Sequence, residues 1–265
     1  MCETLKGKQI AAVKLGNCEK LQKLGCFNKN STDYDLMVRE TINSVISRGA
    51  VILTKLGGGK NLLLSPEYGG RILFRPKNID SSEKFHFKME FTDNSAFTVA
   101  LSGFGGVQML KDDGLGNSYV YRRDFSNVPS PICGEFEFSS FKEGLARKNV
   151  NIKTAIVGKD ALVVGLSNSI FQDILFRAGI HPKRKASNLS DKEALRLFDA
   201  VKAIVKERIR LGGKNLFVDF YGKPGMYKPS MGPNMKGLPC KKCGSIVEAM
   251  SLGGGQVFFC PKCQI

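Results

Sequence analysis

No segment of the sequence approaches the roughly 18 consecutive apolar residues that a membrane-spanning helix requires. The first residues, Met1-Cys2-Glu3, do not open a secretory signal peptide, and the chain contains no internal repeat and no long low-complexity tract. These absences predict an intracellular, cytoplasmic protein with no membrane partner. In a reducing compartment the eight cysteines are not expected to form disulfides.

Acidic residues are scarce beside basic ones. The chain has 24 Asp and Glu residues against 40 Lys and Arg residues, which gives a formal net charge of +16 and a pI of about 9.5. A basic protein gains affinity for polyanions because each phosphate that Lys or Arg neutralises releases counterions. Nucleic acid is therefore favoured as the partner, ahead of an acidic membrane surface. The length of 265 residues allows two domains, or one large domain with a small appendage.

Four of the cysteines have the spacing of a metal site. Cys240 and Cys243 form one Cys-x2-Cys pair, and sixteen residues separate it from a second pair, Cys260 and Cys263. Two such pairs place four thiolates around Zn²⁺ in a tetrahedron, with the residues between them in a β-hairpin that turns at Gly253-Gly254-Gly255. Because four sulfur ligands fill the coordination shell, the sequence predicts one zinc ion with a structural role.

The first half of the chain has the alternating pattern of β-strands. In FHFKMEF, residues 85–91, Phe or Met occupies every second position, and the turn sequence TDNS separates this segment from SAFTVALS. His86 falls on the polar face and is expected to be solvated. Further short strands are predicted in KQIAAVKL, GAVILTKL, KNLLLS and RILF. This pattern predicts a β-sandwich or barrel-like domain, followed by a proline-containing linker over residues 125–134.

The second half has helical patterns. Residues 138–148 and 153–158 each predict a short helix. A longer helix is predicted to begin at Ser190, which forms a capping box with Glu193, and to stop at Gly212-Gly213. Residues 221–239 contain many Gly and Pro residues without periodicity and are expected to form a linker.

A tight turn is predicted at Gly165-Leu166-Ser167-Asn168, with Asn168 as the N-cap of a helix that runs through Ala178. The N–H groups at the start of such a helix face whatever lies beyond the turn, and they form a ready anion site. Taken alone, a capped helix is more often structural than functional. The basic residues that follow this helix and the four-cysteine ribbon behind it favour the functional interpretation.

This order of motifs resembles the formamidopyrimidine-DNA glycosylase and endonuclease VIII family. The family's Gly-Leu-Gly-Asn turn is matched by Gly165-Leu166-Ser167-Asn168, and its ribbon ending is matched by Cys260-Pro261-Lys262-Cys263-Gln264. Between them, Gln172-Asp173 and Leu175 to Pro182 match the family's helix pattern, with Ile174 where glutamate is usual. The match is specific across residues 150–265 and looser across the β-domain.

The resemblance implies an α+β protein with three parts. These are an N-terminal β-sandwich domain over residues 1–130, a helical helix-two-turns-helix domain over residues 131–235, and a zinc ribbon over residues 236–265. Most of the helix that precedes the first long strand in the family is expected to be missing, because the chain reaches LKGKQIAAV by Leu5. In the family double-stranded DNA lies between the two lobes. We expect the protein to be a monomer and to be associated with the nucleoid.

The resemblance also implies an activity and its DNA contacts. Family members hydrolyse the N-glycosidic bond of a damaged base, rotated out of the stack, and cleave the abasic strand. By the same resemblance Asn168 holds a phosphate, and Phe104 fills the place of the everted base. Further DNA contacts are expected from Lys183, Arg184 and Lys185, whose alternative is a solvated charge run, and from Gln256, which follows Gly255 where the family's ribbon has arginine.

The catalytic residues depart from the family. Members begin Met-Pro-Glu and use the proline amine as a Schiff-base nucleophile, whereas this chain begins Met1-Cys2-Glu3. Three explanations are open: a truncated or misassigned start, a degenerate binder, or a processed chain in which the α-amine of Cys2 attacks and Glu3 acts as the acid. Ala50 occupies the place of the β-domain lysine, with Lys60 as an alternative or a solvated hairpin residue, and Gly103 replaces an arginine before Phe104.

Three functions are therefore weighed. The first is a DNA glycosylase and abasic-site lyase of base-excision repair. The second is a catalytically degenerate homologue that binds distorted or damaged duplex DNA. The third, a zinc-ribbon protein that binds RNA, agrees with the charge but leaves the match from Gly165 to Lys185 unexplained.

Overall fold

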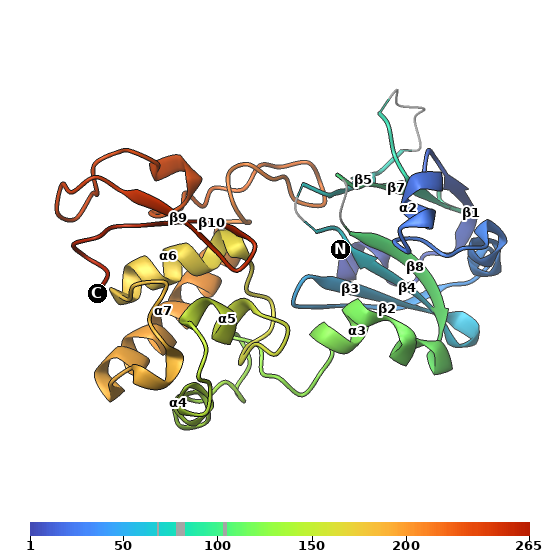
Figure 1. Cartoon of the computed structure of the whole chain (residues 1–265). Helices are drawn as coiled ribbons and strands as arrows, with labels where there is room; N and C mark the ends of the chain where they lie inside the picture. The colour runs from blue at the N-terminus through green and yellow to red at the C-terminus, as the bar shows by residue number, and fades with distance from the viewer. Residues whose placement is uncertain (68, 78–82, 103–104) are drawn as a thin grey trace. The chain divides into compact units, whose positions relative to one another are not determined.

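The computed structural model describes residues 1–67, 69–77, 83–102 and 105–265. Its contacts divide the chain into two compact units (Figure 1). Unit 1 consists of Met1–Ser126 with Asn215–Gly225, and unit 2 consists of Asn127–Lys214 with Met226–Ile265. The predicted α+β fold, with a β-sandwich, a helical region and a four-cysteine ribbon, is confirmed.

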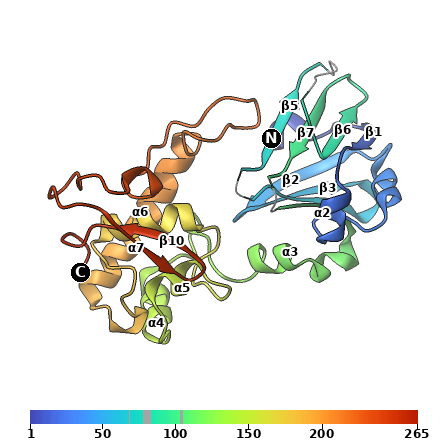
Figure 2. The same cartoon turned by 45° about the horizontal axis from the view of Figure 1, so that its top comes forward.

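Unit 1 is a sandwich of two antiparallel four-stranded sheets, seen as two layers in Figure 2. One sheet has the order β1-β6-β7-β5 and comprises β1 (Ile10–Leu15), β6 (Phe87–Phe91), β7 (Ala96–Ala100) and β5 (Arg71–Arg75). The other has the order β2-β3-β4-β8 and comprises β2 (Ile42–Arg48), β3 (Val51–Leu56), β4 (Lys60–Ser65) and β8 (Gly106–Lys111). Short helices accompany the sheets: α1 (Cys2–Leu5), α2 (Glu19–Lys23) and α3 (Tyr119–Asp124).

The core of unit 1 follows from the alternation seen in the sequence. Phe87, Met89 and Phe91 of β6 are buried together with Tyr34, whose ring lies 5.8 Å from that of Phe87. Two strands, β2 and β8, escaped the sequence interpretation. A bulge between Ile42 and Ser44 breaks the two-residue period in β2, so no clean alternation marks that strand.

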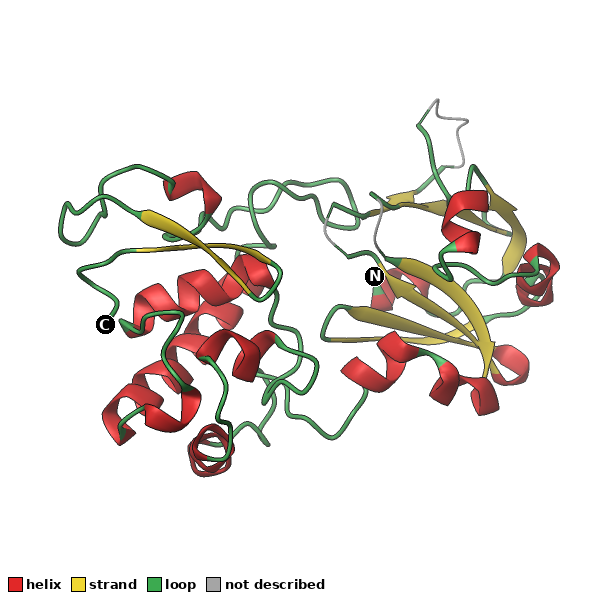
Figure 3. Cartoon of the chain, viewed as in Figure 1, coloured by secondary structure: helices red, strands yellow, loops and turns green. Residues whose placement is uncertain are grey.

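Unit 2 is built from helices and a β-hairpin, drawn red and yellow in Figure 3. The helices are α4 (Phe138–Ala146), α5 (Ile152–Val157), α6 (Asn168–Ala178) and α7 (Asp191–Arg210), and the hairpin strands are β9 (Glu248–Leu252) and β10 (Gly255–Phe259). The predicted capping box is confirmed, because the Ser190 side chain accepts from the Glu193 N–H while the Glu193 carboxylate accepts from the Ser190 N–H. Helix α7 packs on α4 and α6, and β10 lies against α6.

One segment of unit 1 comes from far along the chain. Residues 215–225, here called the crossing segment, leave the helical unit after Lys214 and return at Met226. Within unit 1, Phe220 stacks on Phe74 with 5.4 Å between ring centroids, and the Phe220 carbonyl accepts a hydrogen bond from the Phe74 N–H. The sequence placed residues 221–239 in a linker and drew the domain boundary after residue 130, and neither interpretation anticipated this exchange between units.

The described residues contain no candidate for a membrane-spanning helix. None of the helices there combines the length and the apolar composition that crossing a bilayer requires.

Candidate metal centre and nucleic-acid interface

The four predicted metal ligands come together. Within unit 2, the sulfur atoms of Cys240, Cys243, Cys260 and Cys263 all lie within 4.8 Å of one another. The Cys240 and Cys263 sulfurs are 3.9 Å apart and the Cys243 and Cys260 sulfurs 3.5 Å apart. A tetrahedral shell with Zn–S bonds of about 2.3 Å has edges of about 3.8 Å, and both measured separations are close to that value.

The ribbon is fastened to α6 by a buried glutamine, Gln172, whose contacts the sequence did not indicate. Gln172 donates through Nε2 to the Asn168 carbonyl at 2.9 Å and accepts through Oε1 from the Phe258 N–H at 2.8 Å. Its side chain is only 3% exposed, so both hydrogen bonds are shielded from water. At the ribbon's end, Gln264 donates to the Ile180 carbonyl at 3.0 Å. Gln172 and Gln264 therefore fix the position of the ribbon relative to α6 and the residues that follow it.

Helix α6 begins one residue earlier than the sequence indicated. Ser167, in an extended conformation, is the N-cap residue, and Asn168 is the first helical residue, so the prediction of Asn168 as N-cap is wrong. The Ser167 side chain makes no capping hydrogen bond, and Asn168 is exposed. The first N–H groups of a helix have no intrahelical acceptor, which leaves this end of α6 suited to an anion.

Lysine and glycine residues join Asn168 at this helix end. A Cβ built on Gly255 would lie 3.9 Å from both the Asn168 Nδ2 and the Lys153 Nζ. The Lys153 ammonium donates to the carbonyls of Leu252 and, at 3.0 Å, Gly253. We call Lys153, Asn168 and Gly253–Gly255 the α6–ribbon cluster. Its hairpin turn requires glycine, because Gly253 and Gly254 have φ values of 53° and 76°.

Lys153 is a functional candidate that sequence reasoning missed. The residue is 5% exposed, and burial lowers the pKa of its ammonium. It lies at the start of a six-residue helix, and its partners are about a hundred positions away, separated by 99 and 100 residues. No local pattern marks such a residue. Its ammonium occupies the neighbourhood of Gly255, where the family's arginine is missing.

The other side chains of unit 2 that are predicted to contact DNA differ in whether they are free to bind a phosphate. Lys183 and Lys185 are exposed, and Gln256 is exposed on β10 beside Gly255. Arg184 is engaged within the protein, since its guanidinium pairs with Glu193 at 3.0 Å and also donates to backbone carbonyls. A phosphate contact by Arg184 would have to compete with that ion pair.

The predicted N-terminal residues lie on α1 in unit 1. Cys2 and Glu3 are exposed, and the Cys2 thiol donates to the Val45 carbonyl at 2.9 Å. The hydroxyl of Thr4 contacts that of Tyr221 in the crossing segment. The short helix is thus held between β2 and the crossing segment, with the Glu3 carboxylate one residue from Cys2.

Ala50, which occupies the place of the family's lysine, and Lys60, its predicted alternative, are far apart in the β-domain. Lys60 pairs with Glu40 at 2.6 Å, at the end of β3 opposite to Ala50. The six residues of β3 span about 20 Å. Lys60 therefore cannot stand in for a side chain at position 50.

The turn that contains Ala50 is tied to a buried carboxylate. The Ala50 N–H donates at 2.8 Å to Asp124, which is 3% exposed and also pairs with Arg123. Gly49 has φ +61°, and a Cβ there would lie 2.7 Å from the Asp124 carboxyl carbon. Asp124 thus takes the role of holding this turn. Phe104 and Gly103 lie outside the described residues.

His86 differs from its sequence interpretation. It is half-buried, and its Nδ1 accepts from the Leu101 N–H at 3.0 Å. Burial lowers the pKa of the imidazole, which agrees with a neutral acceptor. The prediction of a solvated surface histidine is wrong because β7 ends beside it and leaves this N–H without a strand partner.

Comparison with known proteins identifies the helical region and the four-cysteine ribbon. The profile of the formamidopyrimidine-DNA glycosylase H2TH domain matches residues 128–219, and that of the zinc finger found in FPG and IleRS matches residues 237–265. The "Formamidopyrimidine-DNA glycosylase" of Listeria innocua is 30% identical over 233 residues, covering 86% of this chain and 84% of that protein. The protein of that name in Shouchella clausii is 28% identical over 271 residues, covering 100% of this chain and 94% of its own.

Solved structures agree on the fold. The Lactococcus lactis Fpg, in complex with DNA containing an abasic site, superposes with a TM-score of 0.84 at 20% identity, covering 99% of this chain and 94% of that one. A β-sandwich, a helix-two-turns-helix unit and a C-terminal zinc ribbon in one chain define a class of two-unit proteins. Within that class, the chain belongs to the formamidopyrimidine-DNA glycosylase family.

Proposed function

We propose that the protein is a DNA glycosylase of base-excision repair that acts on damaged double-stranded DNA. The observation that carries the proposal is the α6–ribbon cluster, in which Lys153, Asn168 and the glycine turn meet at the start of α6. A helix N-terminus beside an ammonium group suits a DNA phosphate. The net charge of +16 and the relationship to glycosylases, one of them solved on abasic-site DNA, support the same partner.

The proposal includes a supporting set of groups. One structural zinc ion per chain holds the ribbon in place, and the protein acts as a monomer. Exposed Lys183 and Lys185 contact flanking phosphates, Gln256 contacts the backbone beside the glycine turn, and Phe104 enters the stack. The zinc ribbon (residues 236–265) works as an extension of the helical domain, because Gln172 and Gln264 bond the two.

The proposed chemistry starts from an α-amine. Once Met1 is removed, the Cys2 amine attacks the sugar C1′, the C1′–N bond to the damaged base breaks, Glu3 donates a proton to the departing base, and the amine bound to C1′ releases a proton. An unprotonated amine is the form that can attack a carbon centre in this way. Contacts of α1 with Val45 and Tyr221 hold these residues in place.

Borohydride trapping tests this chemistry. The imine between the Cys2 amine and an abasic-site aldehyde should be reduced to a stable protein–DNA adduct that maps to residue 2. We expect slow trapping, since the proposed nucleophile lies on a helix of only four residues and its displacement by 1 Å can cost on the order of 100-fold in rate. An adduct at Lys60 would identify another nucleophile. Intact duplex binding with no adduct would favour the second candidate.

The second candidate is a DNA-binding homologue without catalysis that recognises damaged or distorted duplex. The turn at Ala50 favours this candidate, because position 50 has no lysine and its backbone N–H already donates a hydrogen bond to Asp124. Both candidates share the DNA interface, so they differ only in the outcome of the trapping experiment.

Substitutions in the α6–ribbon cluster test the interface itself. Asn168→Ala should weaken duplex binding about tenfold to a hundredfold, the value of one hydrogen bond to a charged group, with little change in stability because Asn168 is not the cap. Lys153→Met should lower the slope of log K against log salt by about 0.9, one phosphate contact. Lys159→Met, an exposed lysine outside the cluster, is the matched control. Equal effects of Lys153→Met and Lys159→Met on the slope would contradict the assignment.

A further inference from the structure

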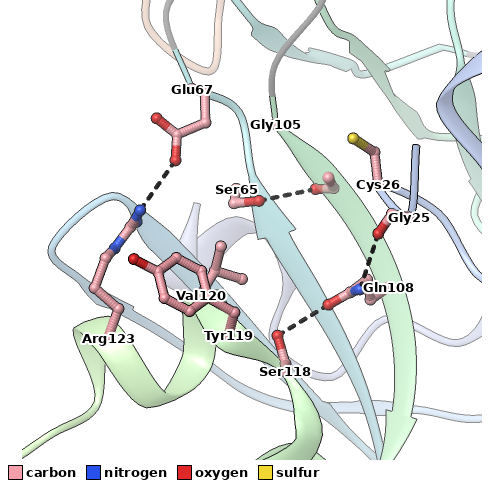
Figure 4. A pocket seen from close by; sticks show the side chains of 11 residues that line it. Gly25, Cys26, Ser65, Glu67, Gly105, Gln108, Ser118, Tyr119, Val120 and Arg123 are labelled. Atoms are coloured by element: carbon pink, nitrogen blue, oxygen red, sulfur yellow. Dashed lines mark hydrogen bonds and ion pairs between the residues drawn. The ribbon is translucent and has the colours of Figure 1, made fainter. Parts of the chain in front are cut away.

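Unit 1 contains a pocket that neither the predicted catalytic residues nor the α6–ribbon cluster uses. It has a volume of about 370 Å³ and lies between α3, the start of β8 and the end of β4 (Figure 4). Binding pockets for small organic groups begin at about 300 Å³, so the space is large enough for a nucleobase. All lining residues belong to unit 1.

The walls of the pocket combine an aromatic ring with two polar pairs. Tyr119 is 52% exposed, a large fraction for an aromatic side chain at the edge of a cavity. On one side Arg123 pairs with Glu67 at 3.4 Å, and on the other the Ser118 hydroxyl donates to the Gln108 side-chain oxygen at 2.9 Å (Figure 4). The ring offers a stacking face, and the pairs offer both donors and acceptors at the rim.

The chemistry of these walls suits a heteroaromatic ring with a polar edge. Bases stack on aromatic side chains, and their edges present donors and acceptors that Glu, Gln and Arg side chains recognise. Glu67 and Arg123 keep side-chain exposures of 34% and 30%, so both can still meet a ligand. Aliphatic or purely anionic ligands would leave either the ring or the Glu67 carboxylate without a partner.

The place of the pocket in the chain connects it with DNA. Gly105 lines it, and the preceding residue in the sequence is Phe104, which the family resemblance assigns to the DNA stack. When a nucleotide is extruded from a duplex, the extruded base and the base opposite to it both lose their pairing partner, and stacking on an aromatic side chain can stabilise an unpaired base. Resting on the proposed function, we infer that this pocket binds an unpaired nucleobase of the bound DNA, stacked on Tyr119.

The test compares two duplexes of equal length, one fully paired and one with a single unpaired 2-aminopurine. The wild-type protein should bind the second about tenfold more tightly, as expected for one stacked base, and should quench the 2-aminopurine emission. Tyr119→Ala should remove both the preference and the quenching, whereas Tyr119→Phe should keep both because the ring remains. Leu36→Ala, another exposed apolar side chain of unit 1, is the matched control and should behave as wild type.

The outcomes separate the pocket from the proposed function. If Tyr119→Ala keeps the preference and the quenching, or if the wild type has neither while still binding paired duplex in a salt-dependent manner, the pocket inference is overturned and the proposed function stands. If no duplex is bound, the proposed function itself fails. Because Tyr119 is exposed, its substitution should leave thermal unfolding unchanged, which separates lost binding from lost folding.

Discussion

Removing zinc is expected to unfold residues 236–265, to leave unit 1 folded, and to weaken duplex binding by at least about tenfold. The ribbon has little core of its own: its buried cluster comprises Phe176, Met231, Met235, Cys240, Val247, Phe258 and Cys260, two of which are metal ligands. A structural zinc contributes an apparent binding free energy of about 10 to 16 kcal/mol, far more than so small a cluster supplies. Loss of the ribbon also removes the glycine turn from Lys153 and Asn168, and with it one or more phosphate contacts.

Metal analysis and two cysteine-to-serine variants check this prediction. Protein purified without chelator should contain one zinc per chain, and Cys243→Ser should lose it. Cys133→Ser is the matched control, since Cys133 lies outside the metal cluster and donates to the Ser130 carbonyl as a serine hydroxyl also can. Limited proteolysis should cut the metal-free protein within residues 236–265 first. Zinc-free protein with an intact ribbon would contradict the metal centre.

Substitution of Asp173 by alanine is expected to cost about 3 to 5 kcal/mol of unfolding free energy, the range for breaking a buried charged network. The carboxylate is 3% exposed, contacts the Tyr227 hydroxyl, and accepts from the N–H groups of Ser230 and Met231 at 3.0 and 3.2 Å. Burial raises the pKa of Asp173, although these hydrogen bonds act in the opposite direction. Alanine would leave three donors without this acceptor, and two of them belong to the buried residues Tyr227 and Met231.

Two cations make the loss of Asp173 more costly. Burial lowers the pKa of Arg208 and of Lys214, and the charge of Asp173 acts against that shift in both. Without the carboxylate both cations remain in a poorly solvated region with less compensation. Urea unfolding measures the effect. Asp173→Asn, which keeps one acceptor oxygen, should cost less, and the exposed Asp160→Ala should cost under about 0.5 kcal/mol. Equal costs for Asp173→Ala and Asp160→Ala would contradict the network.

Sequence reasoning succeeded where the determining contacts are local. The spacing of Cys240, Cys243, Cys260 and Cys263 specifies the metal cluster, and Ser190 with Glu193 specifies the start of α7. The alternation in β6 gave its buried face. Each of these signals lies within a few residues, or in a pair of identical motifs, so it can be recognised without knowing what the segment packs against.

The missed features depend on long-range contacts. Lys153 meets the ribbon turn across 99 residues, Gln172 meets Phe258 across 86, and Asp124 meets Ala50 across 74. Tertiary packing selected these pairs, and no local spacing encodes them. The cap at α6 was missed by one residue for a different reason: Ser and Asn are nearly equal as N-caps, so the dipeptide Ser167-Asn168 allows either start.

The crossing segment has a consequence for the order in which the protein is made. Phe220 packs against the core of unit 1, yet it is synthesised after the whole of Asn127–Lys214. Translation proceeds from the N-terminus at roughly 5 to 20 residues per second, and domains generally fold as they emerge. While helices α4 to α7 are being translated, the β-sandwich has already left the ribosome, but Phe74 still lacks Phe220 as its stacking partner. Completion of the N-terminal unit is thus coupled to synthesis of the helical one.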